Sequence, residues 1–134
     1  IFLRGAGGWA IDLKRTILAY VKSGYICLAP EFNDGDFLKG VMDLNKWHKN
    51  FMSHLSFDSR RLGLFSFSRG SYFAYQMIAG NTPYKAWANL SGMVYREMVD
   101  PDIIKRNPVP ALILHGKKDK QIPVDISYNL EKAY

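Results

Sequence analysis

Cysteine is nearly absent from this chain, since Cys27 is the only one in 134 residues. A single cysteine cannot build a disulfide framework, and no spacing of cysteine and histidine suggests a zinc site. Long apolar runs are also lacking: none approaches the ~18 residues of a membrane span, and no signal peptide is visible. We therefore expect no metal, no cofactor and no membrane partner, and we predict a cytoplasmic location.

Blocks of like charge are missing as well. The formal net charge is +6, but Lys and Arg occur as isolated pairs such as Lys14-Arg15 and Lys117-Lys118. Scattered pairs indicate a solvated surface and not a nucleic-acid groove. A composition of 48% hydrophobic and 22% charged residues is typical of a globular protein. The length predicts one domain over residues 1–134.

The most informative stretch surrounds Ser68. The apolar run Leu62–Phe65 predicts a strand, and the Tyr-, Phe- and Met-rich segment that extends to Gly80 predicts a helix. Between them, Ser66-Phe67-Ser68-Arg69-Gly70 has the pattern of a nucleophile elbow with Ser in place of the usual first Gly. Small residues are needed at both ends because strand and helix pack closely while the central hydroxyl points outward. Ser68 is therefore the candidate nucleophile.

A glycine-rich turn, Gly5-Ala6-Gly7-Gly8, follows the strand-like run at residues 1–4. Such a turn lets backbone amides approach a ligand closely. A phosphate cradle is one interpretation, but Ala10 stands where a dinucleotide-binding pattern needs its third glycine. An oxyanion loop with the Ala6 amide as donor fits better. A simple tight turn without function is the third interpretation.

The other regular segments alternate between strand and helix. Strands are predicted at 25–29, 86–90 and 111–114, and helices at 12–23, 38–56 and 124–134. The 25–29 run is apolar throughout, so we expect a buried parallel strand in which Cys27 is a small hydrophobe. Residues 93–107 are predicted to be irregular, with room for a short helix.

This alternation predicts an α/β fold. We expect a three-layer α/β/α sandwich with a mostly parallel sheet of five strands and helices on both faces. Functional residues in such sheets gather at the carboxyl ends of the strands, which is where Ser68 and the glycine-rich turn fall. The chain begins at Ile1, inside a strand-like run, so we expect the sheet to be incomplete at both ends.

A second catalytic signal follows the last strand, in the loop His115–Pro123. A carboxylate at this place can accept the Nδ1 hydrogen of a histidine and so fix its tautomer. Asp119 is the candidate, and a turn cap before Pro123 is its structural alternative. The order nucleophile, then acid, is that of the α/β-hydrolases.

The segments that carry these motifs resemble a known family. Together, 2–5, 24–30, 58–70 and 109–123 are similar to the prolyl oligopeptidase (peptidase S9) branch of the α/β-hydrolase fold, to which dienelactone hydrolases are close relatives. The run Phe65–Gly70 resembles the Phe-Gly-Trp-Ser-Arg-Gly run of bacterial members of that peptidase family. The resemblance implies a serine hydrolase, a peptidase or an esterase, that acts on a peptide or ester substrate. It makes Ser68 the nucleophile, Asp119 the acid and the Arg69 amide an oxyanion donor.

Two features depart from the family pattern. Ser66 and Ser71 replace glycines, and no histidine stands where the general base should be. The family histidine follows a further strand after the acid, so we expect the base beyond Tyr134, because His48, His54 and His115 all lie elsewhere. A hydroxyl without a base is a poor nucleophile at neutral pH. A non-catalytic α/β-hydrolase-like binding or scaffold protein is therefore the alternative, followed by an α/β enzyme that binds phosphate at the glycine-rich turn.

Overall fold

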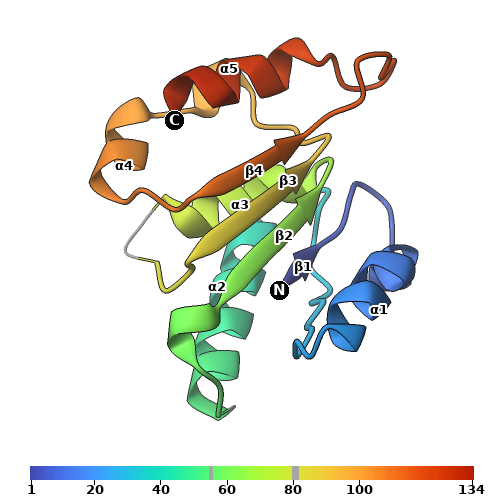
Figure 1. Ribbon diagram of the computed structural model, residues 1–134, viewed down its shortest axis with the longest axis vertical. Coiled ribbons are helices and arrows are strands. Elements are labelled where there is room, and N and C mark those ends of the chain that lie inside the picture. The colour runs from blue at the N-terminus through green and yellow to red at the C-terminus, as the bar shows by residue number, and fades with distance from the viewer. Residues whose placement is uncertain (55, 80–81) are drawn as a thin grey trace.

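A computed structural model of the chain describes residues 1–54, 56–79 and 82–134. In this part of the chain one sheet has four parallel strands in the order β1-β2-β3-β4 (Figure 1). The strands are Phe2–Leu3 (β1), Gly63–Phe67 (β2), Ala86–Leu90 (β3) and Ala111–Leu114 (β4). The predicted α/β fold with a parallel sheet is confirmed.

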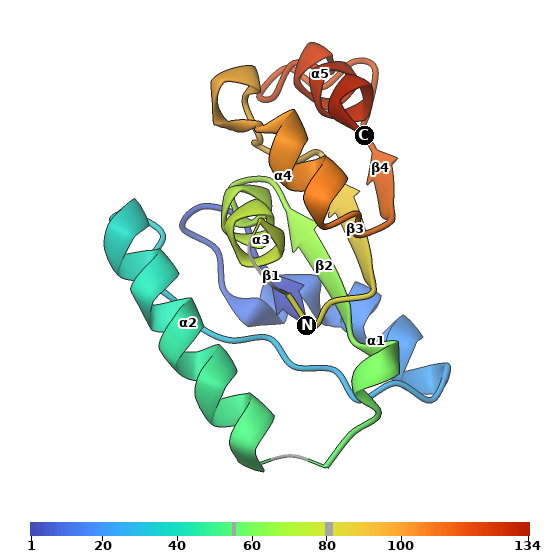
Figure 2. The same cartoon turned by 90° about the vertical axis from the view of Figure 1, so that its left-hand side faces the viewer.

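Helices lie on both faces of the sheet. Figure 2 shows α2, α3 and α4 on one side and α1 on the other. The helices are α1 (Lys14–Lys22), α2 (Phe37–His54), α3 (Gly70–Ile78), α4 (Pro101–Arg106) and α5 (Asp125–Ala133), with 3₁₀ turns η1 (Ala10–Leu13), η2 (Ser59–Arg61) and η3 (Arg96–Met98). The helix predicted for 12–23 is thus divided between η1 and α1. The helix predicted for 38–56 ends at His54. Leu55 and Gly80, which the predictions assigned to helices, lie outside the described residues.

The core lies between the sheet and α3, because α3 is buried along most of its length. Side chains of a strand alternate between the two faces of a sheet, so Leu64 and Trp87, which are paired in register, both point to the α3 side. Gly70 lets α3 begin directly against β1, because a Cβ there would collide with the carbonyl oxygen of Leu3. None of the described helices combines the length and the apolar character that crossing a membrane requires.

The predicted strand at 25–29 is wrong. A single hydrogen bond of 2.8 Å, from the Phe2 amide to the Leu28 carbonyl, joins this segment to β1, and one bond does not make a ladder. β1 itself has only two residues, so it is too short to form a second hydrogen bond with this segment. Tyr25 and Ile26 are 46% and 74% exposed, and Cys27 is half-buried. The apolar run lies at the edge of the molecule and not between two layers.

Candidate active site

Ser68 occupies a sharp turn between β2 and α3. Its φ of 54° lies in a region that residues with a Cβ rarely adopt. Its amide donates to the Leu90 carbonyl at 3.1 Å, and its carbonyl accepts from the amides of Ser71 and Met93 at 3.0 Å each. The turn is therefore fixed to both β3 and α3, as a nucleophile elbow requires.

The glycine-rich turn packs directly against this elbow. A Cβ added at Gly5 would lie 3.2 Å from the Cβ of Ser68, and one added at Gly70 would collide with the carbonyl oxygen of Arg4. The small residues at these two positions thus allow the loop after β1 and the start of α3 to meet at Ser68. The structure brings Ser68, Arg69 and the glycine-rich turn together, as the sequence predicts.

Ser66 and Ser71 stand where the prolyl oligopeptidase family that the sequence resembles has glycines. They form a buried hydrogen-bonded chain beneath the turn at Ser68. Trp87 Nε1 donates to Ser66 Oγ at 2.8 Å, the Ser66 and Ser71 hydroxyls lie 2.9 Å apart, and the Ser71 hydroxyl donates to Asn89 Oδ1 at 2.7 Å. All four side chains are buried. Since the Ser71 proton goes to Asn89, the Ser66 proton must go to Ser71. The chain joins β2, α3 and β3, and the sequence analysis did not predict it.

Residues 5–10, which we call the glycine-rich loop, comprise the glycine-rich turn and the two residues after it. Three amides of this loop are already bound by carboxylates. The pairs are Gly7 with Asp34 at 2.6 Å, Trp9 with Asp12 at 2.7 Å and Ala10 with Glu31 at 2.9 Å. A phosphate at this loop would face three negative charges, which argues against the phosphate cradle. Among the described hydrogen bonds the Ala6 amide has none, so it is free to donate to a ligand.

Asp119 lies just after β4, at the same edge of the sheet as Ser68. Its Oδ1 accepts hydrogen bonds from the amides of Gln121 and Ile122 at 2.9 and 3.0 Å. The bonds from Ile122 and Gln121 lower the pKa of Asp119, and the hydroxyl of Ser91, at the end of β3, contributes to the same shift. Asp119 therefore caps a turn, which is the alternative interpretation given for it in the sequence analysis. It lies beside the carboxyl ends of β3 and β4.

The histidine closest to Asp119 is engaged in the structure of its own loop. His115 Nε2 lies 2.8 Å from the Ile122 carbonyl, which is an acceptor, so this nitrogen carries the proton. His115 Nδ1 then accepts from the Ser127 hydroxyl at 2.7 Å. The side chain is 3% exposed and its Nε2 is 3.6 Å from Asp119 Oδ2. With both nitrogens occupied, His115 is a structural residue and not a free base.

The other two histidines lie on α2. His48 Nδ1 is 2.9 Å from the Tyr84 hydroxyl, and His54 Nδ1 is 2.8 Å from the Asn50 carbonyl. In the described part of the chain, none of the three histidines is hydrogen-bonded to Ser68. The same residues contain no group of three or more His, Cys, Asp or Glu side chains that could hold a metal ion.

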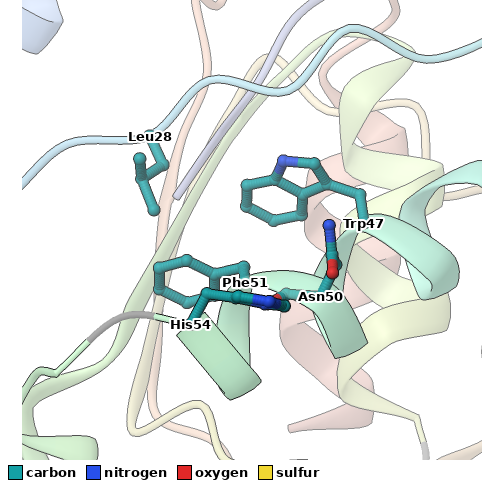
Figure 3. A pocket seen from close by; sticks show the side chains of 5 residues that line it. All are labelled: Leu28, Trp47, Asn50, Phe51 and His54. Carbon is teal, nitrogen blue, oxygen red and sulfur yellow. The ribbon is translucent and has the colours of Figure 1, made fainter.

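The cavity shown in Figure 3 is separate from the elbow. It has a volume of about 260 Å³ and lies between α2 and the segment that contains Leu28. Trp47 and Phe51 stack on each other in its wall, with ring planes 2° apart. Its lining residues are Leu28, Trp47, Asn50, Phe51 and His54. None of these belongs to the elbow, the glycine-rich turn or the Asp119 loop.

Comparisons with known proteins agree with this architecture. No protein-family model matches the chain. The crystal structure of esterase PE8 superimposes with a TM-score of 0.74 and covers 98% of this chain and 74% of that one, at 20% identity. The 2-hydroxy-6-oxo-6-(2'-aminophenyl)hexa-2,4-dienoic acid hydrolase of Metapseudomonas resinovorans is 52% identical over 29 residues, which are 22% of this chain and 10% of that protein.

These similarities define the fold more closely than the chemistry. The chain has an α/β fold with a parallel sheet that matches the fold of esterase PE8. The matched segment spans a tenth of the curated hydrolase. One of the two similar proteins is named an esterase and the other a hydrolase, and neither is named as a peptidase. The predicted placement in the prolyl oligopeptidase branch therefore gains no support.

Proposed function

We propose that this α/β-hydrolase-fold chain belongs to a serine hydrolase that cleaves carboxylic esters through an acyl-enzyme on Ser68. The observation that carries the proposal is the positive φ of Ser68 in a turn fixed on both sides. A strained backbone needs continuous support from its surroundings, and such positions cluster at active sites. The strained turn places Ser68 at the edge of the sheet where parallel α/β folds bind ligands.

The proposed reaction has two steps. Ser68 Oγ attacks the ester carbonyl as a base removes its proton, and the amides of Ala6 and Arg69 donate to the oxyanion of the tetrahedral intermediate. The intermediate collapses to the acyl-enzyme as the alkoxide takes the proton and leaves as an alcohol. Water, activated by the same base, then releases the acid and restores the Ser68 hydroxyl.

The proposed base is a histidine outside residues 1–134, oriented by Asp119. This assignment follows from the engagement of His48, His54 and His115 elsewhere in the described structure. Asp119 Oδ1 caps the turn, while Oδ2 lies 3.6 Å from a His115 nitrogen whose hydrogen goes to the Ile122 carbonyl. In the proposal, Oδ2 accepts the Nδ1 hydrogen of the base.

Ester is proposed over peptide because a similar structure is titled an esterase. The full-length protein should therefore hydrolyse p-nitrophenyl esters with a higher kcat/KM than matched peptide p-nitroanilides. The reverse order would favour the peptidase.

Labelling by a fluorophosphonate tests Ser68 itself. The full-length protein should be labelled, and Ser68→Ala should abolish both labelling and ester hydrolysis. Alanine keeps the Cβ and hence the same backbone strain, so the melting temperature should change little. Ser53→Ala, an exposed hydroxyl on α2, is the control and should be labelled normally. Labelling of the Ser68→Ala protein would contradict the assignment, and an unlabelled parent protein would favour the non-catalytic binding alternative.

A further inference from the structure

Arg4 is the only charged residue among the buried residues of the described chain, at 7% exposed. Its guanidinium donates to the Phe32 carbonyl at 2.8 Å and lies 4.8 Å from the centre of the Phe32 ring. It also pairs with two carboxylates, Glu31 at 2.9 Å and Asp34 at 3.4 Å. Burying a charge is costly unless it is paired and hydrogen-bonded, so this arrangement needs every one of these partners.

Both carboxylates reach from Arg4 to the glycine-rich loop. The second oxygen of Glu31 accepts from the Ala10 amide at 2.9 Å, and the second oxygen of Asp34 accepts from the Gly7 amide at 2.6 Å. Partial burial would raise the pKa of Asp34, but the Gly7 amide and the charge of Arg4 outweigh it and lower that pKa. We call Arg4, Glu31 and Asp34 the arginine clamp.

The clamp also fixes the direction of one peptide group. Arg4 Nη1 donates to the Gly5 carbonyl at 3.1 Å. In a planar trans peptide the C=O and the N–H point in opposite directions, so the Ala6 N–H points away from Arg4. The Cα of Gly5 packs against Ser68, since a Cβ added there would lie 3.2 Å from the Cβ of Ser68. The clamp therefore fixes the direction of the Ala6 amide, which follows the residue that packs on Ser68.

The clamp is linked to the second oxyanion donor as well. Arg69 Nη1 donates to the backbone carbonyl of Asp34 at 3.0 Å, and the Arg69 guanidinium lies 5.8 Å from the centre of the Phe37 ring. The residue that offers the second amide is thus tied to the same loop that holds Gly7. Asp34 therefore connects the residue after Ala6 with the side chain of Arg69.

We propose that the arginine clamp is a positioning device for the oxyanion hole. This inference rests on the proposed serine hydrolase function and extends it to residues that do not touch the substrate. Arg4 holds the Gly5 carbonyl and Asp34 binds the Gly7 amide, so the Ala6 amide between them is held in place for the developing oxyanion. Donors in an oxyanion hole act only when they are held in place before the charge develops, so loosening the clamp should slow the chemical step and leave substrate binding nearly intact.

Arg4→Lys in the full-length protein tests the inference, because lysine keeps the charge and loses the fork that reaches Gly5. Removal of an oxyanion donor costs about 10²–10³ in kcat, so a displaced donor should cost at least about tenfold, with KM within about threefold. Arg60→Lys is the matched control, because Arg60 also pairs with a carboxylate, Asp58, but on the surface. It should leave both constants unchanged.

The Ala6 amide supplies a second readout. In ¹⁵N-labelled parent protein, phosphonylation of Ser68 should shift the Ala6 amide resonance, because a phosphonyl oxygen takes the oxyanion position. Arg4→Lys should weaken that shift. If Arg4→Lys does not fold, Asp34→Ala replaces it and should lower kcat and weaken the same shift.

Three outcomes separate the two proposals. Failure of the parent protein to be labelled overturns the proposed function together with this inference. A labelled parent whose Ala6 resonance does not move overturns the inference alone. Unchanged kcat and an unchanged Ala6 shift in a folded clamp variant would show that the clamp only stabilises the fold.

Discussion

Asp119 caps a turn and is also the proposed acid of the triad, so the two roles can be separated at a single residue. Asparagine can still accept the Gln121 and Ile122 hydrogen bonds through its Oδ1, so Asp119→Asn should keep the turn and the melting temperature. Its amide would instead favour the wrong tautomer of the base, and kcat of the full-length enzyme should fall by about 10⁴. Steady-state kinetics would measure this loss, and a small change in kcat would reduce Asp119 to a turn cap.

The same role makes a geometric prediction. An imidazole with a hydrogen bond at each end should fit between Asp119 and Ser68, so the carboxylate-to-hydroxyl gap should be roughly 6–8 Å. An experimental structure of the full-length protein would measure it directly. A much larger gap would contradict the triad.

At the residue scale, the sequence is informative where chemistry is local. The sharp turn at Ser68 could be predicted because such a turn needs small residues at fixed positions next to it. Arg4 could not, because its partners Glu31 and Asp34 are 27 and 30 positions away and become neighbours only in the fold. Arg is usually a surface residue, and nothing in the sequence next to Arg4 indicates that this one is buried.

At the scale of elements, the buried serine chain predicts a loss of stability. Ser71→Ala would leave the Ser66 proton without an acceptor and Asn89 Oδ1 without a donor. A buried unsatisfied polar group costs about 1–3 kcal/mol, so the free energy of unfolding should drop by at least that amount in urea titrations. Ser53→Ala, at an exposed position, should change it by less than about 0.5 kcal/mol. A fully stable Ser71→Ala protein would show that the chain contributes nothing.

The predicted strands differ in how far the local sequence determines whether they form. The strands at 86–90 and 111–114 were predicted at the bounds that the structure shows, because turn-forming residues delimit each apolar run. The run at 25–29 is also apolar but is joined to β1 by one hydrogen bond. Apolar continuity predicts burial, whereas a strand also needs a partner of sufficient length, which composition does not reveal.

At the scale of the whole molecule, part of the sheet carries an exposed apolar face. Leu112 and Leu114 are 57% and 50% exposed, and both point away from the core face on which Ala111 and Ile113 pack. Apolar patches of this kind promote association. Replacing both leucines with Thr should reduce self-association of residues 1–134, measured by light scattering, and change the free energy of unfolding little.

The control for this variant lies on the same strand. Ile113→Thr changes a side chain that packs against the core, so it should destabilise the protein without reducing its association. An equal effect of the two substitutions on stability would show that the leucines are buried in solution.

The response of the whole molecule to acid should depend on His48, which joins α2 to the segment before β3 through Tyr84. Burial lowers the pKa of His48 below its usual value of 6.5. The unfolded chain therefore binds this proton at a higher pH than the folded one, so stability is retained above about pH 6.5 and falls as the pH drops below it. His48→Gln, which can still accept from Tyr84, should remove this loss in unfolding curves between pH 7 and pH 5.

His54→Gln, on the exposed side of α2, serves as the control and should keep the loss. An unchanged loss in His48→Gln would assign acid sensitivity to the carboxylates, among which Asp34 and Asp119 have lowered pKa values and titrate at lower pH.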